Sequence, residues 1–129
     1  MSAVLEPPAE LYAELCGLPE TLTGEILGGV LYTQPRPAGP QAYAASALGA
    51  DLFGFGRGAD SPGGWWILDE PELHFIRDAE VCVPDLAGWR RERMPSIPRG
   101  HRFEVAPDWV CEILSPGTAR KDQIGRAHV

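Results

Sequence analysis

Two stretches of the sequence, Glu80-Val-Cys-Val-Pro-Asp85 and Asp108-Trp-Val-Cys-Glu-Ile-Leu-Ser115, have the apolar pattern of a β-strand. Each carries one carboxylate, Asp85 or Glu112, on the face that its apolar neighbours two positions away also occupy. A carboxylate on an apolar face is costly unless it is paired, protonated or bound to a cation. We therefore predict a two-carboxylate metal site. The alternative is a pair of solvated acids at two strand ends.

The composition is that of a globular protein with one domain, which we place at residues 1–123. Of the 129 residues, 44% are hydrophobic and 22% are charged. No apolar run approaches the roughly 20 residues of a membrane span, and residues 1–8 lack the basic and apolar regions of a signal peptide. We therefore expect a cytoplasmic location and no membrane contact.

The net charge and the cysteines limit which classes of function the sequence allows. A net charge of -7 argues against unspecific nucleic-acid binding by the whole surface, although a local basic patch remains compatible with it. Cys16, Cys82 and Cys111 are odd in number and form no CxxC pair. Neither a disulfide framework nor a zinc knuckle is indicated, and we expect all three to be small core residues.

The remaining pattern predicts an α+β domain with a mainly antiparallel sheet. We expect, in order, a helix over 8–17, a hairpin over 25–32 that turns at Gly28-Gly29, a proline loop over 34–40, a helix over 41–53, a meander of strands over 64–85, the strand over 108–115, and a helix that begins near Thr118.

The sequence also predicts the packing face of the second helix and the role of one histidine. Apolar spacing places Tyr43, Ala44, Ala47, Leu48 and Leu52 on one packing face of the second helix. His74 lies between apolar residues, which favours a hydrogen-bonded structural role over a role as a ligand.

Five arginines lie close to the predicted site in sequence, at positions 90, 91, 93, 99 and 102. Such a cluster is usually a solvated face of the protein. The alternative is contact with the phosphates of a nucleic acid.

Three segments together resemble one known family: Gly63-Gly-Trp-Trp-Ile-Leu-Asp-Glu-Pro-Glu-Leu-His74, Val83-Pro-Asp-Leu-Ala-Gly-Trp-Arg-Arg-Glu-Arg-Met-Pro95 and Ala106-Pro-Asp-Trp-Val-Cys-Glu-Ile-Leu-Ser-Pro116. They closely resemble the Uma-two family, whose members are described as restriction endonucleases, and the likeness runs from about residue 25 to residue 122. The resemblance implies a restriction-endonuclease-like fold of the PD-(D/E)xK superfamily. In that fold a curved, mainly antiparallel or mixed sheet lies between helices, and here its C-terminal part would be missing.

The resemblance also implies site residues. The family's Pro-Asp matches Pro84-Asp85, and its Glu-x-Leu-Ser matches the segment that begins at Glu112. Asp85 and Glu112 would be the catalytic residues and would bind Mg²⁺, or alternatively Mn²⁺, together with the backbone carbonyl of Ile113. Glu25 matches a hairpin acid of the family and is a weaker candidate for the same cavity.

The sequence departs from the family pattern at three positions. Leu114 stands where the superfamily usually has its lysine, two residues after the acid. In this family the lysine comes four residues after an aspartate that matches Asp122, but position 126 holds Arg126. Gln41 replaces the histidine that is common after the proline loop.

The resemblance implies a DNA endonuclease that hydrolyses phosphodiester bonds, and many relatives in the superfamily act as homodimers. The alternative is a non-catalytic module of nuclease-like fold that holds nucleic acid or a protein partner. The five arginines suggest this alternative.

Residues 124–129, Ile-Gly-Arg-Ala-His-Val, are also spelled by one frame of a common sequencing adapter (ATCGGAAGAGCACACGTC). We therefore expect these six residues to be non-native, with a genuine short C-terminus as the alternative.

We predict that the 129-residue chain does not cleave DNA as it stands, and that a restored C-terminal helix with lysine at position 126 gives cleavage. Loss of one preorganised group that stabilises transition-state charge lowers rates about a hundredfold to a thousandfold. Arginine is a poor substitute because its planar fork does not match the point charge of an ammonium. A plasmid-nicking assay with Mg²⁺ or Mn²⁺ measures this, with the fold checked by circular dichroism. Metal-dependent cleavage by the 129-residue chain that Glu112→Gln abolishes would contradict the prediction.

Overall fold

The computed structural model of the chain describes residues 8–56 and 63–114. The predicted helix near Thr118, the family positions Asp122 and Arg126, and the tail 124–129 lie outside the described residues. The described elements are α1 Pro8–Cys16, β1 Leu22–Leu27, β2 Val30–Pro35, α2 Gly39–Leu52, the 3₁₀ turn η1 Phe53–Gly56, β3 Trp65–Asp69, β4 Glu72–Ile76, β5 Glu80–Cys82, β6 Leu86–Arg90, β7 Arg102–Phe103 and β8 Trp109–Cys111.

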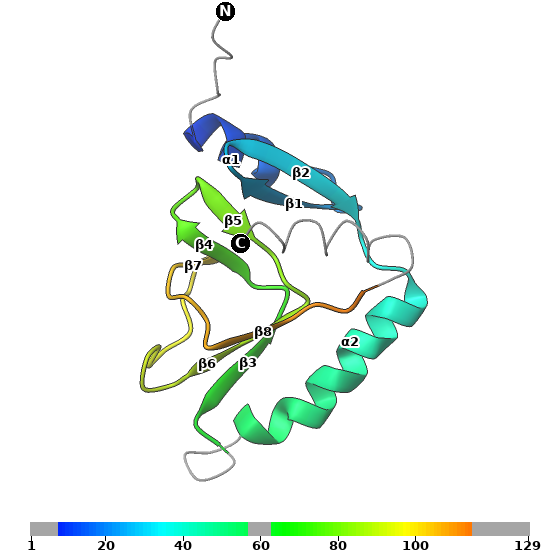
Figure 1. Cartoon of the computed structure of the whole chain (residues 1–129), viewed down its shortest axis with the longest axis vertical. Coiled ribbons are helices and arrows are strands. Elements are labelled where there is room, and N and C mark those ends of the chain that lie inside the picture. Colours follow the sequence, from blue (N-terminus) through cyan, green and yellow to red (C-terminus); the bar gives the residue numbers. More distant parts are fainter. Residues whose placement is uncertain (1–7, 57–62, 115–129) are drawn as a thin grey trace, which may run out of the picture.

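The strands form two sheets, with strand orders β2-β1-β5-β4-β7 and β3-β6-β8. All pairs are antiparallel except β4 with β7, which is parallel. Figure 1 shows α1 beside the β1–β2 hairpin and α2 along the side of the second sheet. The α+β class with a curved, mainly antiparallel and mixed sheet is therefore confirmed. Within the described residues, the longest helix has 14 residues, and none is long and apolar enough to cross a bilayer.

One long, bent hairpin connects the two sheets. β3 continues into β4 and β5 returns into β6, and the pairs are β4 with β5 and β3 with β6. The bend falls at Pro71 and Pro84, which are both buried and cannot donate to a strand ladder because they lack an N–H. Next to the two prolines, the Glu70 N–H donates to the carbonyl of Asp85 at 3.0 Å. Asp85 thus lies at the point where the chain passes from one sheet to the other.

The bend corrects two predictions about strands. The strand expected over residues 80–85 ends at Cys82, because Pro84 interrupts the ladder. The meander expected over residues 64–85 does not form, since β3 pairs with β6 and not with β4. The strand expected over 108–115 is likewise limited to β8.

The first helix and the first hairpin form as predicted. α1 ends at Cys16, and the N–H of Gly17 donates to the carbonyls of Ala13 and Glu14. β1 and β2 turn at Gly28 and Gly29, whose φ angles of 57° and 79° suit a two-residue turn. The proline loop begins later than predicted, because β2 extends to residue 35. A proline is tolerated there since β2 is at the edge of its sheet.

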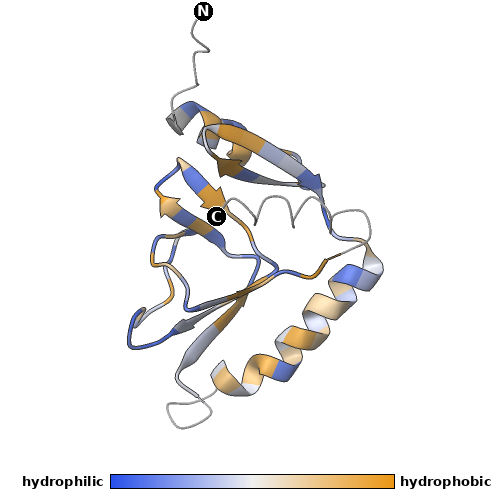
Figure 2. Cartoon of the chain, in the orientation of Figure 1, coloured by the Kyte–Doolittle hydropathy of each residue, from blue (hydrophilic) through white to orange (hydrophobic). Residues whose placement is uncertain are grey.

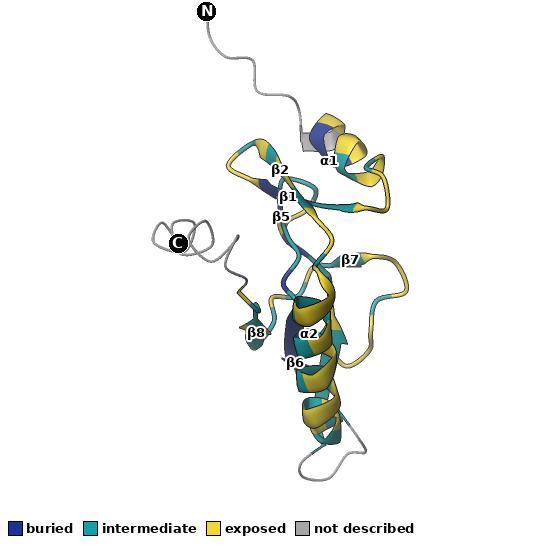
Figure 3. Ribbon diagram, turned by 90° about the vertical axis from the view of Figure 1, so that its right-hand side faces the viewer, coloured by how far each residue is buried: buried dark blue, intermediate teal, exposed yellow. Residues whose placement is uncertain are grey.

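The second helix forms where predicted, and Ala44, Leu48 and Leu52 of its predicted packing face are half-buried. No residue of α2 is buried, and Tyr43 is 76% exposed, so its side chain does not belong to the packing face. Gly49 approaches the second sheet, where an added Cβ would lie 3.5 Å from Asp69 and 3.7 Å from Leu86. Figure 3 shows the exposed outer surface of α2 in front of the buried β6. The small residues of α2 allow this close approach.

Two hydrophobic clusters form the core. One joins α1 to the first sheet through Leu11, Tyr12, Ile26 and Val81. The other lies at the hairpin and consists of Leu73, Ala87, Trp89 and Met94. Figure 2 shows apolar residues on β1 and β5, and also along much of α2.

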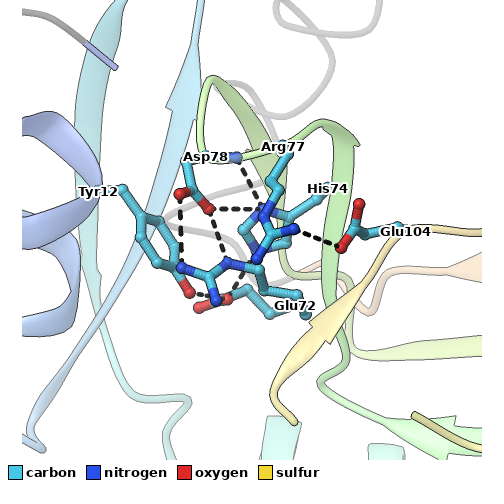
Figure 4. Close-up of polar contacts among 7 residues, drawn as sticks. Tyr12, Glu72, His74, Arg77, Asp78 and Glu104 are labelled. Carbon is cyan, nitrogen blue, oxygen red and sulfur yellow. Dashed lines mark hydrogen bonds and ion pairs between the residues drawn. The ribbon is translucent and has the colours of Figure 1, made fainter. Parts of the chain in front are cut away.

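A polar network ties α1 to β4 and contains the predicted structural histidine (Figure 4). His74 is buried, and its Nδ1 accepts the N–H of Asp78 at 2.9 Å. Nε2 therefore carries the proton and donates to Glu72 at 2.8 Å. The Tyr12 hydroxyl donates to the same Glu72 oxygen at 2.5 Å, and burial together with this bond raises the pKa of Tyr12. The structural role of His74 is confirmed.

We predict that Tyr12→Phe lowers the free energy of unfolding by about 1.5–3 kcal/mol, because hydrogen bonds to a charged group contribute that much. Urea unfolding with an unchanged m-value measures it. The control is Tyr43→Phe, which removes the same hydroxyl from an exposed side chain. Equal midpoints for the two variants would show that the bond to Glu72 contributes nothing.

Candidate functional site

A small polar cavity of about 60 Å³ lies at the bend of the long hairpin. It is lined by Glu25, Gln34, Gln41, Val83, Asp85, Glu112 and Ile113, and we name it the carboxylate cavity. The three residues predicted from the sequence as metal ligands, Asp85, Glu112 and Ile113, therefore lie together. The weaker candidate Glu25 shares the cavity, and so does Gln41.

Strand pairing brings the two predicted acids side by side. β6 and β8 are antiparallel, and the last pair of their register joins Leu86 to Cys111. Asp85 immediately precedes the first of these residues and Glu112 immediately follows the second. The two acids are therefore neighbours at the same end of the β6–β8 pair, although they come from distant parts of the chain.

The peptide groups of Ile113 are held by side chains on both sides. Its N–H donates to Asp85 Oδ2 at 2.6 Å. Its carbonyl accepts from Gln41 Nε2 at 2.8 Å. The chain after Glu112 is thus fixed by a carboxylate of the bend and an amide of α2.

Glu25 is anchored to the same bend from the first sheet. Its Oε2 accepts the N–H of Val83 at 2.8 Å. Ile26, the next residue in β1, pairs with Val81 in the ladder between β1 and β5. This pairing positions the Glu25 side chain. A third carboxylate thus faces the cavity, and the sequence indicated it only through the family resemblance.

The cysteine next to the bend reports the negative charge of the cavity. Burial, followed by the charges of Glu25 and Glu112, raises the pKa of Cys82 to about 12. A thiol with this pKa is protonated at neutral pH. Cys82 and Cys111 are half-buried, so they match the prediction of core residues only in part. Cys16 differs from the prediction, since it is exposed.

The donor set suits a magnesium ion that keeps several waters. Within residues 8–56 and 63–114, no three His, Cys, Asp or Glu side chains are arranged to hold a metal together, so a closed protein cage is not present there. Mg²⁺ is usually bound by one or two carboxylates plus water and substrate phosphates. Asp85, Glu112 and the carbonyl of Ile113 offer such an open set.

Four of the five arginines that lie close to the predicted site in sequence contact other residues of this chain. Arg93 pairs with Asp108 at 2.8 Å and Arg102 with Asp78 at 2.8 Å. The guanidinium of Arg91 stacks on Trp66 at 3.9 Å, and that of Arg90 lies 5.5 Å from the ring of Trp65. The Arg90 N–H and Arg93 also lower the pKa of Asp108. These contacts agree with a structural surface more than with a phosphate-binding patch.

A larger cavity of about 710 Å³ lies between the end of α1, the start of β1 and the bend. Val83 lines both cavities. Neither Asp85 nor Glu112 lines the larger one. This cavity is larger, but it does not contain the two acids of the predicted site.

The comparisons with known proteins agree with this fold and family. The crystal structure of a "putative nuclease belonging to DUF820" from Anabaena variabilis is similar to the chain with a TM-score of 0.68 and 24% identity, over 89% of this chain and 64% of that protein. The fold is thus that of a nuclease-like protein, and the chain spans less than two thirds of the length of that relative. Residues 9–128 match the model of the Uma2 family, described as "Putative restriction endonuclease", and the chain belongs to this family. A search of curated proteins found no match.

We predict that Glu112→Gln lowers the pKa of Cys82, because one of the charges that raise it is removed. The pKa stays above its ordinary value, since burial is the larger cause. The pH dependence of alkylation measures it in a background with Cys16→Ser and Cys111→Ser. Glu92→Gln, at an exposed position, is the control. An unchanged alkylation profile for Glu112→Gln would show that this charge does not act on the thiol.

Proposed function

We propose that the chain is the nuclease-type domain of a magnesium-dependent DNA endonuclease, with Asp85 and Glu112 as metal ligands. The observation that carries the proposal is that these two acids line one small cavity at the end of the β6–β8 pair. Membership of a family described as restriction endonucleases supports nucleic acid as the substrate class. The proposal also includes DNA as the substrate, a cytoplasmic location and a homodimer.

The cation would be held by the carboxylates of Asp85 and Glu112 and by the carbonyl of Ile113. When bound, it would supply a Lewis acid for a phosphoryl oxygen and lower the pKa of a bound water. Asp85 would serve in two ways, because the oxygen Oδ2 already accepts the Ile113 N–H while Oδ1 remains for a cation. Glu25 would add negative charge that favours a cation over an anion in the cavity.

The lining of the carboxylate cavity also supports the proposal that the 129-residue chain is inactive. Within the described part of the chain, neither lysine nor arginine lines this cavity. Among these described lining residues, a phosphate would meet carboxylates and amides. Transition-state charge on the phosphate would then be stabilised less, with a correspondingly slow reaction.

We predict that Mn²⁺ or Mg²⁺ binds to the wild-type chain and that Asp85→Asn combined with Glu112→Gln abolishes binding, since the amides carry no charge. Isothermal calorimetry measures both proteins, with circular dichroism as the test of folding. The matched control is Asp51→Asn combined with Glu14→Gln, which removes the same charge from exposed positions. Equal affinity of the wild type and of the Asp85/Glu112 variant would rule out the proposed site.

A further inference from the structure

The backbone ladder cannot hold the segment that carries Glu112. The register of β6 and β8 ends with the pair of Leu86 and Cys111. Two steps further, Pro84 would stand opposite Ile113, and proline has no N–H to donate to the Ile113 carbonyl. A buried or half-buried carbonyl without a donor is costly. Another group has to supply this hydrogen bond.

Gln41 supplies it from a different element. Its Nε2 donates to the Ile113 carbonyl at 2.8 Å. Its backbone is fixed in the first turn of α2, which also contains Pro40 and in which the Ala42 N–H donates to the Ala38 carbonyl. Asp85 holds the preceding peptide group at 2.6 Å. The residue that follows Glu112 is therefore clamped on both sides.

We infer that Gln41 is a positioning residue of the carboxylate cavity, which sets the place of Glu112 relative to Asp85 through the Ile113 carbonyl. The inference deepens the proposed function and rests on it for its effect on metal binding. It follows from the hydrogen bonds around Ile113 and from the missing donor at Pro84. A carboxamide suits this role because it can donate to the carbonyl without adding charge beside three carboxylates.

Gln41→Met tests the inference, because methionine keeps the length of the side chain and loses the donor. We expect hydrogen exchange of the Ile113 amide, followed by NMR, to become about tenfold faster as the clamp opens. We expect the affinity for Mn²⁺, followed by calorimetry, to fall about tenfold to a hundredfold, as is usual when a partner that orients a metal ligand is lost.

Two further variants make the test specific. Gln34→Met makes the same change in the same cavity. Within the described residues Gln34 makes no hydrogen bond with Ile113, so hydrogen exchange at Ile113 should stay at the wild-type rate. Gln41→His places an imidazole N–H at about the same reach and should restore slow exchange and Mn²⁺ affinity. It also serves as the folded reference if Gln41→Met loses its circular dichroism spectrum.

Each outcome decides the question. Wild-type exchange and affinity in Gln41→Met, equal acceleration by Gln34→Met, or failure of Gln41→His to restore either quantity would overturn the inference. If the wild type binds no Mn²⁺ while Gln41→Met still opens Ile113 to exchange and Gln41→His closes it, the clamp is supported and the proposed metal site is refuted.

Discussion

The fold depends on two buried prolines that interrupt one long antiparallel hairpin. A hairpin of this length would otherwise continue as a single flat ladder. Because Pro71 and Pro84 cannot donate, the hairpin bends between them, and its halves enter different sheets. The bend leaves backbone groups that the ladder no longer satisfies. Side chains then complete the hydrogen bonding, as Glu25 does for Val83.

This exchange of backbone partners for side-chain partners explains why acids gather at the bend. A carboxylate that accepts a backbone N–H is stabilised in a half-buried place where a free acid would be costly. Asp85 and Glu25 each accept one such bond. The same residues can thus be structural and face a cavity suited to a cation. A structural bond does not argue against a functional role of Asp85, because its bond to the Ile113 N–H uses only Oδ2.

The sequence predicted α1, α2 and the first hairpin because these depend on local signals, such as Gly28-Gly29 and the proline and glycine around α1. Periodicity failed at Val83, where an apolar pattern continues through a proline that ends the strand. It also failed at Tyr43, which is exposed although Leu48 and Leu52 of the same predicted face are half-buried. The meeting of Asp85 with Glu112 followed from the pattern, but Gln41 required the structure, since its contact with Ile113 spans 72 positions.

Val83 is the wall shared by the two cavities. Its backbone N–H is bonded to Glu25, an acid of the smaller cavity, and the residue also lines the larger one. Any substitution at this position is therefore constrained twice, once by the shape of each cavity. The shape of the larger cavity is thus tied to the geometry of the smaller one at this residue, although the two cavities have no acid in common.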